Sequence, residues 1–234
     1  MMKTEILDAQ SVSPLDRERM LALMRAHYEH VSPEGFAGDL AKKECVAVFR
    51  ERERISGFST LVMLRETIAR TPVRIFFSGD TVMDRAARNS VALPFAIARV
   101  MLGELDREPG AAVYWLLTSK GYKTFRCLPV FFKDFHPWGN RALSGFEHGV
   151  LSAVCRRLFN GRLDQRRWIL RASNTDQRLR PGVAEITESL RRRADIAMFE
   201  TLNPGHARGD ELVCMARFSR ENLHPHILRK LDAS

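Results

Sequence analysis

The segment Asp84–Ser90 carries two arginines, Arg85 and Arg88, in front of an apolar stretch at residues 91–105 with the spacing of a helix. It follows an apolar run, Val73–Phe77, with the composition of a strand. The first turn of a helix has backbone N–H groups without partners inside the helix, and the helix dipole adds positive charge there. The segment therefore predicts a phosphate site in which guanidinium groups pair with the phosphate oxygens. The alternative is that both arginines lie on the surface without a ligand.

A second basic loop follows the strand predicted at residues 111–118. Lys120 and Lys123 flank Gly121 at the carboxyl end of that strand, where open α/β sheets bind ligands. The loop ends in Lys-Thr, like a nucleotide-binding P-loop, but the first glycine of that motif is missing at the required spacing. We therefore expect Lys120 and Lys123 to bind a cofactor, and we exclude a nucleoside triphosphatase of the P-loop type.

Two side chains are candidates for a general base. Asp80 ends the turn predicted at Ser78–Asp80 and could take a proton from an amine, directly or through water. Its alternative role is that of a turn residue, whose carboxylate bonds to nearby backbone. His206 lies in a loop rich in proline and glycine with acidic residues close in sequence, where it could act as a base over the substrate or serve only the loop itself.

Apolar periodicity predicts the elements that hold these side chains. Ser13 and Pro14 suit the N-cap and first position of a helix at residues 15–28, and Ser32 opens a second, short helix. The remaining elements expected up to the second basic loop are a hairpin of strands at 45–49 and 55–64, a strand at 73–77, a helix at 91–105 and a strand at 111–118. This order indicates a mixed α/β fold, without the strict alternation of a doubly wound sheet.

The C-terminal part has a less regular pattern. We expect helices at 144–159 and 183–193, strands at 168–170 and 211–218, and a long loop at 203–210. Disorder is expected only at the two ends of the sequence, roughly residues 1–13 and the last few residues. Proline and glycine gather near residues 138–144, so we predict a core at residues 14–137 and a C-terminal extension at residues 138–234. The extension would complete the sheet or the acceptor site, and both parts could form one continuous domain.

From about residue 15 to residue 132, the order of elements resembles the GNAT superfamily of acyl-CoA N-acyltransferases. In that family, a loop between a strand and a helix binds the CoA pyrophosphate through its backbone N–H groups. Laid on this sequence, Arg85 takes the first motif position, Arg88 the first glycine position and Ser90 the last. Arg88 departs from the family pattern, because a side chain now occupies the place where the backbone would approach the phosphates closely.

The resemblance implies a mixed, mostly antiparallel twisted sheet with helices on both faces. It also implies an acyl donor, either acyl-CoA or an acyl carrier protein, and a small-molecule acceptor. Tyr122 would be the general acid that protonates the departing thiolate, or else a half-buried aromatic residue with no such role. Acyl-homoserine-lactone synthases share this fold and take acyl groups from carrier protein, so the chain could belong near that branch.

Composition sets further bounds. The 234 residues carry a net charge of +9, and eleven arginines against four acids lie between Arg156 and Arg193, which would attract polyanions. No stretch is long and apolar enough to suggest a membrane span, and no signal-peptide core is present, so we expect a cytoplasmic protein. The four cysteines are scattered and form no ligand pair, so we expect neither a metal nor a disulfide framework.

The sequence thus predicts an acyltransferase that moves an acyl group from a thioester to an amine or hydroxyl. Two alternatives stay open. One is a GNAT-like module that binds a ligand or a protein without catalysis, which the departure at Arg88 favours. The other is a basic nucleic-acid-binding protein, which we consider unfavourable because aromatic residues are not interleaved with the arginines. The oligomeric state cannot be predicted.

Overall fold

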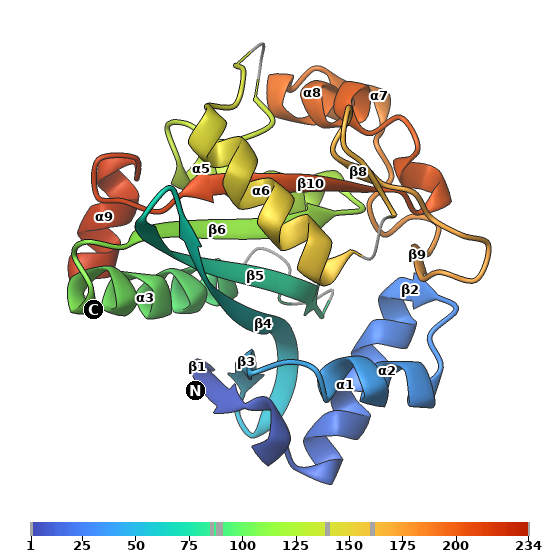
Figure 1. The fold of residues 1–234 in the computed structure, drawn as a ribbon. Helices are drawn as coiled ribbons and strands as arrows, with labels where there is room; N and C mark the ends of the chain where they lie inside the picture. The colour runs from blue at the N-terminus through green and yellow to red at the C-terminus, as the bar shows by residue number, and fades with distance from the viewer. Residues whose placement is uncertain (1, 85–86, 88–90, 139–140, 160–161, 234) are drawn as a thin grey trace.

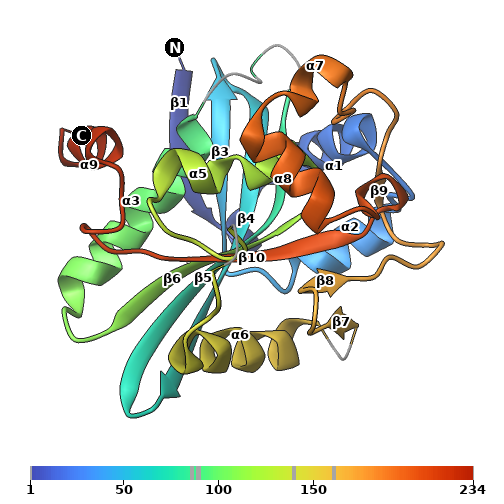
Figure 2. The ribbon, with the colours of Figure 1, turned by 90° about the horizontal axis from the view of Figure 1, so that it is seen from above.

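The fold is built on one twisted sheet with helices on both of its faces (Figure 1, Figure 2). It is seen in a computed structural model that describes residues 2–84, 87, 91–138, 141–159 and 162–233. Eight strands form the sheet in the order β1-β3-β4-β5-β6-β10-β8-β7. Their bounds are β1 Met2–Asp8, β3 Cys45–Glu51, β4 Arg54–Ile68, β5 Thr71–Met83, β6 Ala112–Ser119, β7 Leu163–Asp164, β8 Ile169–Leu170 and β10 Glu211–Arg217.

All neighbouring strands of this sheet are antiparallel except β5 and β6, which run parallel. A two-stranded ladder, β2 (Tyr28–Glu29) with β9 (Arg178–Leu179), lies outside the main sheet. The parallel pair is joined by helix α3 (Ala92–Arg107), as a parallel connection requires a crossover. The predicted mixed, mostly antiparallel sheet is therefore confirmed.

Helices cover the two faces in separate groups. The remaining helices are α1 Pro14–His27, α2 Pro33–Leu40, α4 Tyr122–Phe125, α5 Cys127–Phe131, α6 Gly145–Leu158, α7 Glu188–Arg191, α8 Ala194–Leu202 and α9 Pro225–Asp232, with 3₁₀ turns η1 Ala9–Ser11 and η3 His206–Arg208. In Figure 2, α3, α5 and α8 lie on one side of the sheet and α6 lies on the other. The prediction of helices on both faces is confirmed.

Alternation along the strands divides the core accordingly. Val113, Trp115 and Leu117 of β6 pack into the cluster that includes α3, α4, α5 and α8, whereas Tyr114 and Leu116 pack into the cluster under α6. A third cluster, on the side of β3 and β4 that faces away from α3, holds α1 and α2. Burial on both faces explains why β6 reads as a continuous apolar run rather than an alternating one.

Local signals account well for the helix starts. The Ser13 side chain accepts a hydrogen bond from the Asp16 N–H, with Pro14 at the first helical position of α1, and Ser32 caps α2 in the same way. Ser144 and Glu147 form a reciprocal capping box at the start of α6. These helices begin within a residue of the positions that the sequence predicts.

Three predictions of local structure are wrong. Residues 2–13 are not disordered, because β1 pairs with β3 along its whole length and η1 follows. Ser78–Asp80 is not a turn, because β5 continues through it and is paired with β4 on both sides of Gly79 and Asp80. The helix expected at 183–193 shrinks to α7, since Val183 and Ile186 are drawn into the core as irregular chain and Thr187 caps the helix only later.

The C-terminal residues join the same sheet as the N-terminal ones. Strand β10 pairs with β6, and β8 pairs with β10. The predicted division into residues 14–137 and 138–234 therefore cuts across one sheet, and the division itself stays a prediction. Within the described residues, no helix is both long enough and apolar enough to cross a membrane.

Candidate functional site

The parallel strands β5 and β6 separate at their carboxyl ends. Their ladder runs from Val73 opposite Ala112 to Ser78 opposite Leu117 and then stops, although β5 continues against β4 and β6 continues against β10. At the last rungs, the Trp115 Nε1–H donates to the Ser78 hydroxyl at 2.9 Å. Strands that part in this way leave an opening in the sheet at their carboxyl ends, which is where open sheets bind ligands.

An irregularity in β5 adds to this opening. Ser59 of β4 is paired with Thr81, but Leu61 is paired with Ser78, so Gly79 and Asp80 together face a single residue of β4. Such a bulge takes residues out of the regular ladder and redirects their side chains. A side chain at position 79 would meet the Thr60 hydroxyl at 2.6 Å, so glycine is needed for the close packing.

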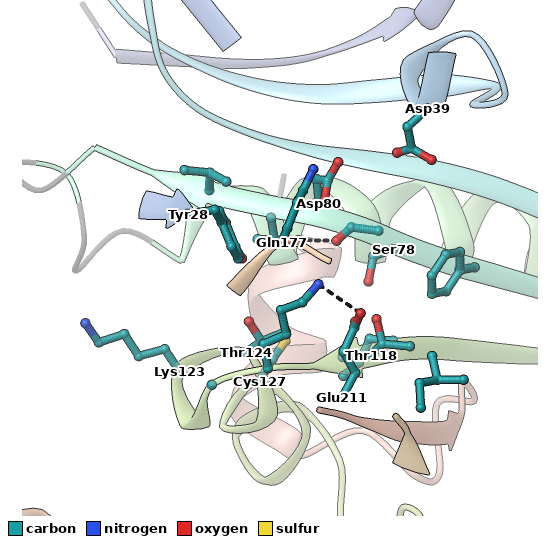
Figure 3. A pocket seen from close by; sticks show the side chains of 18 of the residues that line it. Tyr28, Asp39, Ser78, Asp80, Thr118, Lys123, Thr124, Cys127, Gln177 and Glu211 are labelled. Atoms are coloured by element: carbon teal, nitrogen blue, oxygen red, sulfur yellow. Dashed lines mark hydrogen bonds and ion pairs between the residues drawn. The ribbon is translucent and has the colours of Figure 1, made fainter. Parts of the chain in front are cut away.

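A cavity of about 950 Å³ occupies the opening (Figure 3). Leu93 and Ile97 of α3 and Cys127 of α5 line it from one face of the sheet. Phe77 of β5 and Phe159, just after α6, line it from the opposite face. The cavity therefore reaches both faces through the gap between β5 and β6, and its volume is typical of a pocket for a small molecule or cofactor.

Five charged side chains that line this cavity lie close enough to interact electrostatically. They are those of Asp39, Lys43, Asp80, Lys120 and Glu211. The Lys43 ammonium is 3.0 Å from an Asp39 carboxylate oxygen, and the Lys120 ammonium is 2.8 Å from a Glu211 carboxylate oxygen. In Figure 3, the dashed line that ends at Glu211 marks the second pair. We call these five residues the charged cluster.

Asp80 is the member of the charged cluster without an ion pair or side-chain hydrogen bond in the described part of the chain. Burial raises its pKa to about 6, and the nearby Asp39 carboxylate adds to the rise, while Lys43 and Lys120 oppose it. A carboxylate with a pKa close to neutrality is suited to accept a proton. The structure thus places this predicted general base in a cavity, next to two cations.

Lys120 and Glu211 form a pair that is largely withdrawn from solvent. Burial acts to raise the pKa of Glu211, but the Lys120 ammonium and the Thr118 hydroxyl outweigh it, so the pKa is lowered. Burial acts to lower the pKa of Lys120, but Glu211 raises it above its usual value. The ammonium also lies 5.8 Å from the centre of the Tyr28 ring, whose own pKa is raised to about 12 by burial. Both partners are therefore charged.

The other residues predicted for cofactor binding do not belong to the charged cluster. Lys123 lines the cavity and donates to the Val183 carbonyl, and Figure 3 shows it pointing away from Asp80. Arg85, Arg88 and Ser90 lie outside the described residues. The helix behind them does reach the site, because Leu93, Pro94 and Ile97 in the first two turns of α3 line the cavity.

Two predicted catalytic residues are not brought to the cavity. Tyr122 is 7% exposed and belongs to the core cluster beneath α3 and α5. His206 lies on η3, half-buried with its ring centre 5.5 Å from that of Phe199, and burial lowers its pKa. Neither side chain is part of the cavity wall. The catalytic roles of all three residues stay predictions, and Asp80 is the one of them that lines the cavity.

Sequence reasoning missed Tyr28, Asp39, Lys43 and Glu211. Asp39 and Lys43 stand four residues apart at the end of α2, a spacing that places them on one helix face but does not reveal what faces them. Glu211 is the first residue of an apolar strand, and this position could have been noticed in the sequence. A charged side chain at the start of a buried strand needs a partner of opposite charge. That partner, Lys120, is 91 positions away in the chain, so the pair becomes visible only in the fold.

The basic segment between Arg156 and Arg193 is largely neutralised by acids. Six of its eleven arginines form ion pairs: Arg157 with Glu66, Arg162 with Asp176, Arg171 with Asp164 and Asp210, Arg178 with Glu29, Arg191 with Glu200, and Arg193 with Asp195. Several of these acids come from other parts of the sequence. The local excess of charge therefore does not become a continuous basic face of the same strength, which weakens the nucleic-acid alternative.

No family model matches the sequence, and no curated protein matches it either. The chain is similar in fold to acetyltransferases among the solved structures. A probable N-acyltransferase of Enterococcus faecalis is 12% identical, covering 94% of this chain and 66% of its own, with a TM-score of 0.42. A Trypanosoma brucei acetyltransferase is 20% identical, covering 62% of this chain and all of its own, with a TM-score of 0.38.

The toxin AtaT, in a variant bound to acetyl-CoA and to part of its antitoxin, is 17% identical over 56% of this chain and 85% of its own, with a TM-score of 0.36. Nothing in these three structures points to the acyl-homoserine-lactone synthase branch. The likeness to them is partial and assigns no function to this chain.

Among the described residues there is no group of acids, histidines and cysteines able to hold a metal ion.

Proposed function

We propose that the protein is an acyltransferase that moves an acyl group from a thioester donor to an amine. The observation that carries this proposal is the position of Asp80 on a bulge at the point where β5 and β6 separate, with no ion pair to its carboxylate among the described residues. A cavity that reaches both faces of the sheet allows donor and acceptor to enter from different sides and meet beside that carboxylate. Bringing two reactants together in this way is itself a large part of catalysis.

The proposed donor side is the face of α3. Leu93, Pro94 and Ile97 bring the start of this helix to the cavity, and the Arg85 and Arg88 loop immediately precedes it in the chain. A diphosphate of CoA, or the phosphate of a carrier-protein arm, would bind at the helix start. The thioester would then extend along the apolar wall toward the gap between the strands. The same site could serve either donor.

The reaction would proceed in balanced steps. Asp80 takes a proton from the acceptor ammonium, and the free amine attacks the thioester carbonyl carbon, forming the C–N bond. Backbone N–H groups of the bulge around Gly79 would stabilise the negative charge on the carbonyl oxygen. The C–S bond then breaks, and the second proton from nitrogen ends on the departing sulfur. The products are an amide and a free thiol, and Asp80 returns its proton to solvent.

The first test is donor binding and turnover with the purified chain. Thermal unfolding is measured with acetyl-CoA, a long-chain acyl-CoA, free CoA and ATP, because a ligand that binds the native state raises the melting temperature. Release of thiol from acetyl-CoA is then followed with a panel of amines. We expect stabilisation by CoA compounds above ATP, and amine-dependent thiol release that Asp80→Asn slows by about 10²-fold or more.

Binding without turnover across the panel would favour the alternative of an inactive ligand-binding module. Absence of any stabilisation by CoA compounds would shift the donor to an acyl carrier protein, tested by the same thiol release from an acylated carrier. If neither donor binds, the proposal is wrong. Cytoplasmic location is part of the proposal, because both kinds of donor are made there.

A further inference from the structure

The charged cluster has an excess of one negative charge. Three carboxylates, those of Asp39, Asp80 and Glu211, face two ammonium groups, those of Lys43 and Lys120. Each lysine already contacts one carboxylate, at 3.0 Å for Asp39 and 2.8 Å for Glu211. Asp80 is therefore the carboxylate of the cluster that could bind a further cation. An ionised carboxylate away from bulk water is costly unless a cation meets it. A bound ammonium group would supply that cation.

Other charged residues that line the cavity carry more positive than negative charge, among them Lys42, Arg157, Arg162 and Asp176. The side chains of Arg157 and Arg162 are 59% and 53% exposed, so they lie toward solvent. Asp176 pairs with Arg162, and Arg157 contacts Glu66 through Nε at 3.0 Å. Lys42 is exposed and, within the described residues, has no ion pair. Two cations, Lys42 and Arg157, therefore remain unmatched by acids of the cavity wall itself. We call these two residues the basic rim.

The basic rim lies on the acceptor side rather than the donor side. Arg157 belongs to α6, on the face of the sheet opposite to α3, as Figure 2 shows for the two helices. Lys42 follows α2, and its neighbour Lys43 lies 6.0 Å from the ring centre of Phe77, which packs in the cluster beneath α6. A phosphate bound at the start of α3 would not reach these cations from its own face of the sheet. They would instead meet the far end of the acceptor.

We infer that the acceptor is a small molecule with a primary amine at one end and an anionic group at the other. Its ammonium would bind Asp80 in the charged cluster, and its carboxylate or phosphate would bind the basic rim. Guanidinium and ammonium groups at the rim suit either anion, and Arg157 can offer two parallel N–H donors. This inference rests on the proposed function and adds the class of acceptor to it.

The test compares acceptors of equal chain length. Acetyl-CoA is the donor, and the acceptors are 5-aminopentanoate, pentylamine, 1,5-diaminopentane and 3-aminopropyl phosphate. The ratio of kcat/KM for 5-aminopentanoate to that for pentylamine is measured by thiol release. We expect a ratio on the order of ten or more, the scale of one charge-assisted hydrogen bond. The aminoalkyl phosphate shows whether phosphate or carboxylate is preferred, and the diamine should be the poorest acceptor.

Substitutions locate the effect. Lys42→Gln and Arg157→Gln should each lower the ratio, and the double variant should bring it close to one. Arg65→Gln is the matched control, because Arg65 is an exposed arginine on β4 that does not line the cavity, and the ratio should not change. The affinity for acetyl-CoA, measured by calorimetry, should be the same in these four variants as in the wild type. A loss of acetyl-CoA affinity in the rim variants would assign the rim to the donor and overturn the inference.

Failure of the inference can be distinguished from failure of the proposed function. Equal rates with pentylamine and 5-aminopentanoate, or a preference for the diamine, would overturn the acceptor class while leaving acyl transfer intact. Binding of the four acceptors is also measured by calorimetry without donor, so the inference does not depend on turnover. We expect 5-aminopentanoate to bind more tightly than pentylamine, and to lose that binding in Asp80→Asn. Absence of binding by all four would overturn the inference.

Discussion

The Lys120 ammonium lies 2.8 Å from a Glu211 carboxylate oxygen; Glu211 is the first residue of β10, and Lys120 directly follows the last residue of β6, the antiparallel neighbour of β10. The register places Leu212 opposite Ser119, so Glu211 and Lys120 are adjacent to the last paired position. The Lys120 side chain is 17% exposed and the Glu211 side chain is 24% exposed, so most of the pair is shielded from solvent. The pair therefore connects the ends of β6 and β10 where they line the cavity.

Removing one partner should destabilise the protein strongly. Glu211→Leu leaves the Lys120 ammonium without its partner in a poorly solvated place, and we expect a loss of about 2 to 4 kcal/mol in the free energy of unfolding. The double variant Lys120→Met/Glu211→Leu should recover most of that loss, since no unpaired charge remains. Urea denaturation of the wild type, both single variants and the double variant gives the coupling energy. A double variant as unstable as Glu211→Leu would contradict this account.

Protonation of Asp80 should lower kcat/KM at acidic pH. Its pKa is raised to about 6, and a general base must be ionised, so kcat/KM should rise with pH up to about 6 and then level off. Asp80→Asn should remove this fall at acidic pH and lower kcat/KM by about 10² or more. The measurement is a pH–rate profile by thiol release. An unchanged fall at acidic pH in Asp80→Asn would assign the titration to another group.

The same pKa predicts a pH dependence of stability with the opposite sign to the usual aspartate. The folded-state pKa of about 6 lies above the ordinary value of 3.8, so the native state binds the proton more tightly than the unfolded state. The stabilising contribution is complete below the ordinary value and is lost as the pH rises toward 6. Asp80→Asn, which stays neutral, should therefore gain stability relative to the wild type between pH 4 and pH 6 and keep the gain above it. Melting temperatures across this range test the prediction.

The loop before α3 should control donor affinity. Arg85→Ala and Arg88→Ala are each expected to weaken acetyl-CoA binding by on the order of tenfold, since each would remove a charge-assisted hydrogen bond. Arg65→Ala serves as a control for loss of a surface arginine. Calorimetry gives the affinities, and circular dichroism checks that the fold is retained. Unchanged affinity in both loop variants would remove these residues from the site.

Tyr122→Phe should decide whether the tyrosine is the general acid. The ring lies in the core and does not line the cavity, so we expect kcat to stay within about twofold of the wild type. A general acid contributes roughly 10²-fold or more to the rate, and its loss would also remove an alkaline limb from the pH profile. A large fall in kcat with an unchanged melting temperature would restore the role predicted from the sequence.

Several elements could be predicted from sequence because they depend on local chemistry. Ser13 and Pro14 define the start of α1 through a side-chain cap and a fixed φ angle, and Ser144 with Glu147 does the same for α6. The apolar runs at β5 and β6, with a helix between them, were enough to indicate a mixed sheet. Asp80 was identified as a candidate base because an acid beside a glycine at the end of an apolar run is chemically conspicuous.

The tertiary structure decided what those residues do. Ser78–Asp80 has the composition of a turn, but pairing with β4 on both sides keeps it in β5. The bulge at Gly79 and Asp80 makes Asp80 part of the cavity wall. The same pairing of distant strands gives Lys120 its partner Glu211 and leaves Tyr122 in the core. Caps and periodicity act over a few residues and can be read along the chain. A charged site built from five residues at the ends of α2, β5, β6 and β10 depends on long-range pairing, which only the folded sheet establishes.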